Sequence, residues 1–169
     1  VFGMPYMTLL PVFADEVLGI GNEGYGLLVA CTGVGALSGA LSVAAFGDKV
    51  RRGRAMLLVM LLFGAMLLVF SRSSMPLLSY LLLFGVGAGQ TGYMALNTTL
   101  LQTHASDEMR GRVMSIFFLN RGMVPLGTVG AGFASEVIGV QWTVTIMSSV
   151  VVLLALTAFL RVPRLRSVD

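Results

Sequence analysis

Long apolar runs alternate with short polar stretches along the whole chain. A bilayer has a hydrocarbon core of about 30 Å, which takes about 20 apolar helical residues to cross, within a range of about 17–25. Most of the runs have this length, and they are continuously apolar rather than alternating as in a membrane β-strand. The pattern predicts six membrane-spanning helices, at residues 1–14, 24–47, 55–71, 76–100, 113–134 and 142–160.

The first of these segments is shorter than the others. The apolar run that begins at Val1 is stopped by Asp15 and Glu16, before it is long enough to cross a bilayer. The chain also begins Val-Phe-Gly, without a charged region that would indicate a signal peptide. We therefore expect the missing turns of the first helix to lie upstream of residue 1, so that the chain is a piece of a longer protein.

Composition supports the same class. Of the 169 residues, 56% are hydrophobic and 11% are charged, whereas a soluble domain carries about 25% charged residues. So few charges cannot cover a surface that faces water, and a mean hydropathy of +0.89 is too high for a disordered chain. The sequence therefore predicts an all-α, polytopic membrane protein.

The charged residues predict how the chain is oriented. All but one, Arg121, lie outside the six predicted spans. Nine of the 11 basic residues fall in residues 48–54, 110–112 and 161–169, while the alternate connections are acidic and hold one basic residue, Arg72. The positive-inside rule assigns the basic side to the cytoplasm. Both ends of the chain, including the basic tail 161–169, are therefore predicted to be cytoplasmic.

Several kinds of chemistry are excluded or disfavoured. With one cysteine, Cys31, and one histidine, His104, the chain cannot assemble a disulfide framework or a metal site of the usual Cys/His type. A serine hydrolase would need a histidine within the spans, and none is present. The stretch Gly87–Gly92 matches a dinucleotide-binding pattern, but it lies in an apolar helix instead of following a strand. We predict no enzyme activity, no cofactor, no metal and no nucleic-acid partner.

Glycines in the spans have a simpler interpretation. Small residues let helices approach closely in membranes. We expect this role for three groups of glycines: Gly85, Gly87, Gly89 and Gly92; Gly35 and Gly39; and Gly127, Gly130 and Gly132.

Polar residues within the spans are the candidates for function. Gln90, Tyr93 and Asn97 are spaced i, i+3, i+7 and share one helix face. This face either lines a central pathway or forms hydrogen bonds between helices. Arg121, beside Asn120, would be costly at the middle of a span, so it either faces an aqueous cavity or pairs with neighbouring helices.

Pro125 follows Arg121 by four residues. Proline removes one helical hydrogen bond and kinks a helix, and Gly127 makes the same region easier to bend. We therefore predict a kink at Pro125 and Gly127. A polar residue beside a helix break is a common form of binding site in transporters.

Two loops resemble the major facilitator superfamily. Gly47-Asp48-Lys49, followed by Arg51-Arg52-Gly53-Arg54, is similar to the Gly-x-x-x-Asp-Arg-x-Gly-Arg-Arg loop of that family, although Lys49 replaces an arginine and one residue is added before Gly53. Leu101-Gln102-Thr103 and 107–115, with Pro125-Leu126-Gly127 after them, resemble the helix ten to eleven junction of the enterobactin-exporter-like branch of drug–proton antiporters.

The resemblance covers the whole chain as helices 7 to 12 of a twelve-helix fold. It implies a secondary active transporter that exports a drug-like small molecule or a siderophore by alternating access, in a bacterial inner membrane, with the N-terminal six-helix half and the lipid bilayer as partners. The pathway candidates are then Gln90, Tyr93, Asn97, Asn120 and Arg121. It further implies a latch that holds one conformation, formed by Asp48, Lys49, Arg51, Arg52, Arg54, Arg110 and Arg112.

One departure bears on coupling. Antiporters of this kind use a proton-titrating group in the membrane, but the six predicted spans contain no carboxylate or histidine. If the proton is the coupling ion, its carboxylate lies in the other half or near Asp15. The alternatives are an oligomeric six-helix channel, which would need a filter-like sequence that we do not see, or a membrane scaffold that transports nothing.

Overall fold

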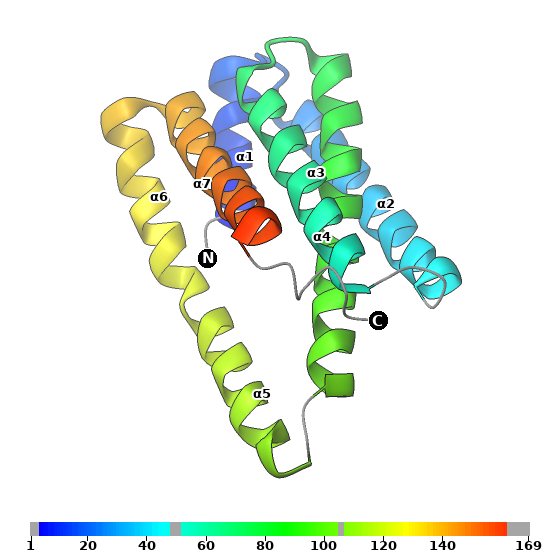
Figure 1. The fold of residues 1–169 in the computed structure, drawn as a ribbon. Coiled ribbons are helices and arrows are strands. Elements are labelled where there is room, and N and C mark those ends of the chain that lie inside the picture. Colours follow the sequence, from blue (N-terminus) through cyan, green and yellow to red (C-terminus); the bar gives the residue numbers. More distant parts are fainter. Residues whose placement is uncertain (1–3, 48–51, 105–106, 162–169) are drawn as a thin grey trace.

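The computed structural model describes residues 4–47, 52–104 and 107–161. Within these ranges the chain is helical and contains no strand, which confirms the all-α class (Figure 1). The helices in chain order are α1 Tyr6–Val12, the π-helix η1 Phe13–Val17, α2 Gly21–Phe46, α3 Arg52–Arg72, α4 Pro76–His104, α5 Asp107–Gly122, α6 Val124–Ile138 and α7 Val140–Arg161.

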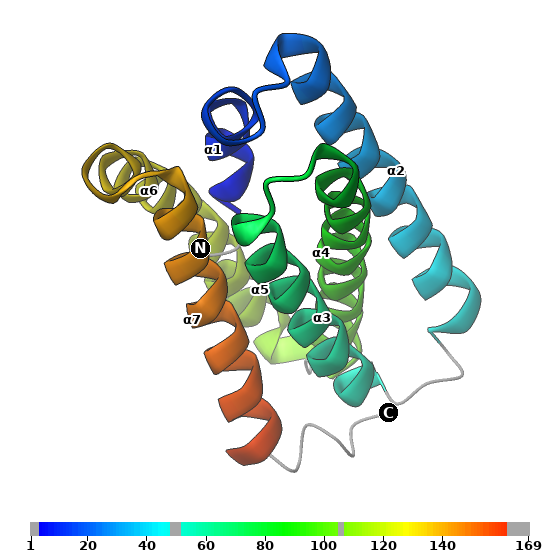
Figure 2. The same cartoon turned by 90° about the horizontal axis from the view of Figure 1, so that it is seen from above.

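The helices pack in the order α2, α4, α3, α7 and α6, each against the next. Seen from above, α4 lies between α2 and α3, and α6 is at the far side of α7 (Figure 2). The first helix lies between the two ends of this row: α1 packs against α2, α6 and α7, and η1 packs against α2 and α7. The core contains apolar residues from α1, η1, α2, α3, α4, α6 and α7, including Leu10, Phe13, Leu67 and Leu83.

Glycines bring the backbones of α2 and α4 into contact. A Cβ atom added to Gly35 or to Gly39 would fall on the carbonyl oxygens of Phe84 and Ala88 on α4. In the other direction, a Cβ on Gly87 would fall on the carbonyl oxygen of Thr32. Any side chain at these positions would push the two helices apart, so the predicted close-packing role of these glycines is confirmed.

Polar contacts join α3 to α7 at the end where α3 finishes. The hydroxyls of Ser71 and Thr145 are hydrogen-bonded at 2.9 Å, and the Arg72 guanidinium lies 4.2 Å from the centre of the Trp142 ring. On the other side of α3, the ring of Phe70 stacks on Phe13 of η1 with 4.5 Å between ring centres. The end of α3 is therefore fixed to both η1 and α7.

The first helix does not stop where the apolar run stops. The α-helical part ends at Val12, but the chain continues as a π-helix through Asp15 and Glu16 to Val17, with a backbone hydrogen bond of 3.1 Å from the N–H of Leu18 to the carbonyl of Phe13. Both carboxylates are exposed. The helix therefore runs three residues beyond the predicted apolar segment 1–14, since exposed acidic side chains at a helix end reach water.

The predicted span 113–134 is interrupted at Met123, two residues before Pro125, and a bend at Pro125 and Gly127 stays a prediction. The helix α5 already begins at Asp107 and ends at Gly122, and α6 runs from Val124 to Ile138. Pro125 occupies the first turn of α6, where a missing N–H is tolerated. The two helices follow one another along one line in Figure 1. The break precedes the proline because the ring of Pro125 would clash with the backbone carbonyl of residue 121 in a continuous helix.

Two glycines of α6 do not mark a close contact between helices. A Cβ on Gly130 or Gly132 would meet nothing within 4 Å. No helix covers these positions among the described residues, so our expectation of close packing there was wrong.

Within the part of the chain that the structure describes, three helices are long and apolar enough to cross a membrane. They are α2, α3 and α7, with mean hydropathies of 1.9, 2.3 and 2.3 over their most apolar windows. The helix boundaries of α2, α3, α4 and α7 lie within four residues of those expected from the sequence. That all six segments span the membrane stays a prediction.

Substitutions at two glycines of α2 test the backbone contact. Replacing Gly35 with Ala should lower the free energy of unfolding by about 1–3 kcal/mol, the usual cost of overpacking, because the new methyl meets a backbone carbonyl. Gly33 lies on the same helix with open space around it, so Gly33→Ala should be neutral or stabilising by up to about 1 kcal/mol. The measurement is unfolding in detergent micelles, and equal stability of the two variants would contradict the contact.

Candidate functional site

The central helix α4 has three distinct faces. Gly87 and Ala88 face α2, as described above. Gly89 and Gly92 face α3, where added Cβ atoms would lie 3.0 Å from Cβ of Phe63 and 3.5 Å from Cγ1 of Val59. Residues 90, 93 and 97 lie on the remaining face, because a helix turns by 100° per residue. Two faces without bulky side chains thus hold α4 in the bundle, and the third carries polar groups.

Gln90 is the point where this polar face meets the first helix. The hydroxyl of Tyr6 donates a hydrogen bond to Oε1 of Gln90 at 3.3 Å. The amide nitrogen of Gln90 in turn lies 3.2 Å from the sulfur of Met4, which is a weak acceptor. Gln90 is half-buried. Its amide therefore bridges α1 and α4 across 84 positions of sequence.

Tyr6 is a site residue that the sequence did not identify. Its side chain is 2% exposed, and its hydroxyl reaches the amide of Gln90 on α4. A tyrosine whose body is apolar and whose tip is polar commonly finds a hydrogen-bond partner when buried. The signal was present in the sequence as a single tyrosine in an otherwise apolar segment, but nothing in the sequence indicated which helix it would meet.

The other polar candidates have no contact of this kind to a neighbouring helix in the described residues. Tyr93 and Asn97 are half-buried on the same face of α4 as Gln90. Asn120 and Arg121 belong to the last turn of α5, next to the break at Met123; their side chains lie outside the described residues. The structure thus brings Gln90 together with Tyr6 and Met4, while Arg121 remains a candidate by its backbone position beside the helix break.

The predicted latch falls partly outside the described residues. Asp48, Lys49 and Arg51 lie there, as does the side chain of Arg110. Arg52 is the first residue of α3, and Arg54 is exposed in the first turn of the same helix. Arg112 is exposed near the start of α5. Their shared role as a latch stays a prediction.

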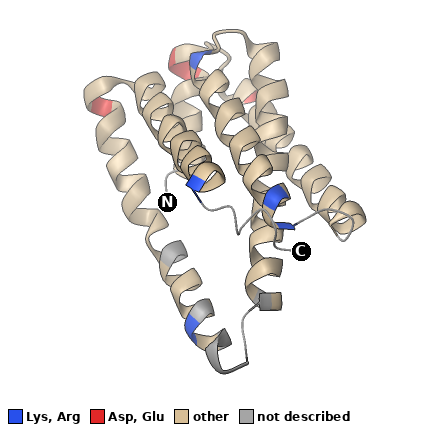
Figure 3. Cartoon of the chain, in the orientation of Figure 1, with Lys and Arg blue, Asp and Glu red and all other residues tan. Residues whose placement is uncertain are grey.

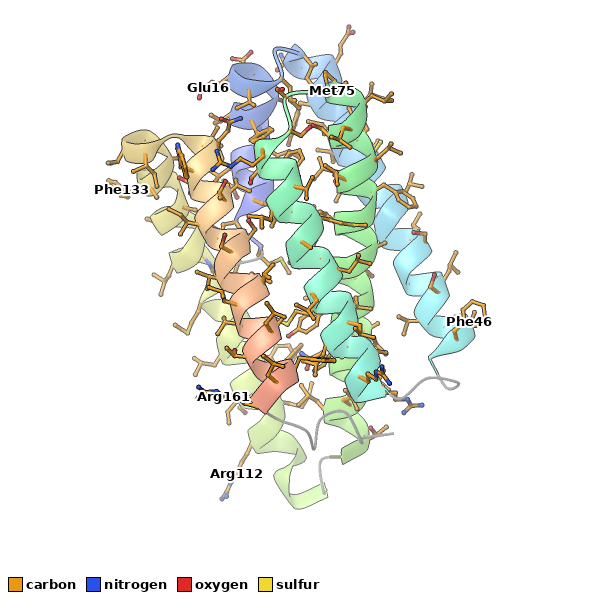
Figure 4. The ribbon with its side chains drawn as sticks, turned by 45° about the horizontal axis from the view of Figure 1, so that its top comes forward. Glu16, Phe46, Met75, Arg112, Phe133 and Arg161 are labelled. Carbon is orange, nitrogen blue, oxygen red and sulfur yellow. The ribbon has the colours of Figure 1, made fainter. Side chains whose placement is uncertain are left out.

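Charge divides the described residues between the two ends of the bundle. Acidic side chains gather at one end and most of the basic side chains lie toward the other (Figure 3). Figure 4 labels Glu16 at the acidic end and Arg112 and Arg161 at the basic end. The acidic end is formed by η1, the start of α2 and the end of α6, which carry Asp15, Glu16, Glu23 and Glu136. Among the described residues no cluster of three or more His, Cys, Asp or Glu could hold a metal ion.

Comparison with known proteins decides the family. The model of the major facilitator superfamily matches residues 1–169. The chain belongs to this superfamily. It is therefore an integral membrane protein of a transporter family, and not an enzyme. A relative with the name staphyloferrin A transporter, from Staphylococcus aureus (strain NCTC 8325 / PS 47), is 26% identical over 145 residues, which are 86% of this chain and 36% of the relative.

The chain thus spans about a third of the length of the curated relative that it matches. No solved structure matches it.

A double-mutant cycle tests the contact between Tyr6 and Gln90. Tyr6→Phe and Gln90→Leu, combined and separate, should show a coupling of about 0.6 kcal/mol in the free energy of unfolding, the average for hydrogen bonds between membrane helices. Tyr25 on α2 has no hydrogen bond to Gln90, so Tyr25→Phe combined with Gln90→Leu should be additive. Equal coupling in both cycles would contradict the contact.

Proposed function

We propose that the chain forms the C-terminal half of a twelve-helix secondary transporter that moves a siderophore or a drug-like small molecule across a membrane by alternating access. The observation that carries this proposal is the family match over all 169 residues. The name of the curated relative, a staphyloferrin A transporter, supports the siderophore as the substrate class.

The polar face of α4 supplies the substrate contacts in this proposal. Gln90, Tyr93 and Asn97 provide amide and hydroxyl groups, and Tyr6 extends the face onto α1. Small-molecule sites are mostly apolar with a few placed polar groups of this kind. Arg121, beside the break between α5 and α6, then attracts an anionic group of the substrate or neutralises a carboxylate of the other half. Substrate binding at Gln90 would replace its present contacts to Tyr6 and Met4.

The missing half covers apolar surface in this proposal. Apolar side chains of α5 are strongly exposed: Ile116 at 68%, Phe118 at 61% and Leu119 at 68%. Among the described residues, α5 packs only against its chain neighbours α4 and α6. Its remaining faces need an apolar environment, which lipid and the N-terminal six helices would provide together.

Orientation and direction follow from charge and resemblance. The basic end, with Arg112 and Arg161, faces the cytoplasm in this proposal because of the positive-inside rule. The latch loop and both ends of the chain are then cytoplasmic, in a bacterial inner membrane. The resemblance to drug–proton antiporters supports export of the substrate against proton entry.

Proton coupling requires a titratable group. The two carboxylates of η1 lie in a helix that continues α1, at the acidic end of the bundle. We propose that coupling uses a carboxylate of the missing half or Asp15, which is the carboxylate of this chain closest to the α-helical part of the first segment.

Reconstitution tests the half-transporter. The full-length protein should expel staphyloferrin A from loaded proteoliposomes when a proton gradient is applied, whereas residues 1–169 alone should transport nothing. Ethidium, a drug-like cation, distinguishes the two substrate classes in the same vesicles. Transport by residues 1–169 alone, at a rate near that of the full-length protein, would overturn the proposal.

Substitution of Gln90 tests the pathway. Gln90→Ala in the full-length protein should weaken apparent substrate affinity by about tenfold, since one polar contact is worth about 1.4 kcal/mol. Gln141→Ala removes the same side chain from the first turn of α7, away from the polar face of α4, and should leave affinity unchanged. Equal effects of both variants would place the substrate elsewhere.

Arg121 has its own test. Arg121→Ala should reduce export of an anionic siderophore more than export of ethidium, because the guanidinium attracts the anionic group alone. Unchanged efflux of both, with normal expression, would make Arg121 dispensable.

A further inference from the structure

A basic residue and an apolar groove adjoin one another at the acidic end of the bundle, outside the polar face of α4. We propose that they form a binding site for one anionic phospholipid of the surrounding bilayer, with its headgroup phosphate at Arg72 and one acyl chain between α6 and α7. This inference does not rest on transport, but only on the position of the chain in a membrane.

Arg72 is a cation in a region of acidic residues. It is the last residue of α3, and its side chain is exposed. Its guanidinium carbon lies over the Trp142 ring, 4.2 Å from the ring centre. Among the described residues, which include Asp15, Glu16, Glu23 and Glu136, no carboxylate pairs with it. Stacking uses the face of a guanidinium and leaves its N–H edge free for a phosphate.

Trp142 places this pair at the surface of the membrane. It is the single tryptophan of the chain, is 53% exposed, and lies in the first turn of α7. Tryptophan is enriched at the depth of the lipid headgroups. The N-terminus of a helix also favours an anion, and the first turn of α7 holds no acidic residue. Both features support a phosphate beside Arg72.

The groove begins within the same turns of α7. It has a volume of about 230 Å³ and is lined by side chains of α6 and α7. Its members are Gly127, Gly130, Ala131, Ala134, Ile138, Thr143, Ile146 and Met147. Ile146 lies four residues after Trp142, and therefore on the same side of the helix. The groove thus has one side within a turn of Trp142 and continues along α6.

An acyl chain fits this groove better than a polar molecule. Its lining is almost wholly apolar, and Gly130 faces open space in which an added Cβ would meet nothing within 4 Å. Glycine normally marks a position where another helix packs closely, but in the described residues no helix does so here. Phe133, one residue before Ala134, points away from the bundle and is 68% exposed (Figure 4), as expected of a side chain that faces lipid.

Lipid titration of the full-length protein tests the site. Dioleoyl phosphatidylglycerol is added to the purified protein in detergent, and bound lipid is counted by native mass spectrometry. Arg72→Ala should weaken the tightest binding step about tenfold. Arg161→Ala removes an exposed arginine from the opposite end and should change this step less than twofold. Equal losses from both variants would show binding by net charge alone and would overturn the site.

The groove has a matched pair of variants. Gly130→Leu fills it and should weaken the same step about fivefold, whereas Gly132→Leu adds the same volume on α6 at a position that does not line the groove. Inorganic phosphate should compete poorly, because it lacks an acyl chain. Unchanged lipid binding in Gly130→Leu, or full competition by inorganic phosphate, would overturn the proposal. A loss of folding in Gly130→Leu but not in Gly132→Leu would show that a helix occupies the groove instead.

Discussion

The approach of α2 to α4 is the constraint on which the rest of the bundle depends. Gly35 and Gly39 on one helix and Gly87 on the other let backbone meet backbone. In a membrane, packing of this kind replaces the hydrophobic effect as a source of helix association, since lipid is as apolar as the side chains. Because α4 is fixed in this way and also packs against α3, its rotation about its own axis is determined.

That rotation decides what the polar side chains can do. With two faces of α4 committed to neighbouring helices, the face that carries Gln90 is turned toward the first helix, where Tyr6 meets it at 3.3 Å. A helix with bulkier residues at 87 or 89 would have to rotate or move away, and Gln90 would no longer meet Tyr6. The glycines of α4 therefore position a hydrogen bond in which they take no part.

The sequence predicted the elements better than their contacts. Long apolar runs define helices because no other structure satisfies the backbone in lipid, and this placed α2, α3, α4 and α7 closely. The details differ from the sequence pattern for separate reasons. The first helix runs three residues beyond its apolar run, the segment around Pro125 is interrupted two residues before the ring, and Gly130 looked the same in sequence as Gly35 although nothing packs on it. Tyr6 was missed because its partner is 84 positions away.

The π-helix η1 has a consequence for the spacing of residues in related chains. A π-turn holds one more residue than an α-turn, and it arises by inserting a residue into an α-helix. Loss of one residue between Phe13 and Val17 would restore the α-helix and rotate everything before it by 100° relative to Phe70, which stacks on Phe13. A chain without the extra residue would present a different side of its first helix to α4. The length of this segment therefore determines which residue stands opposite Gln90.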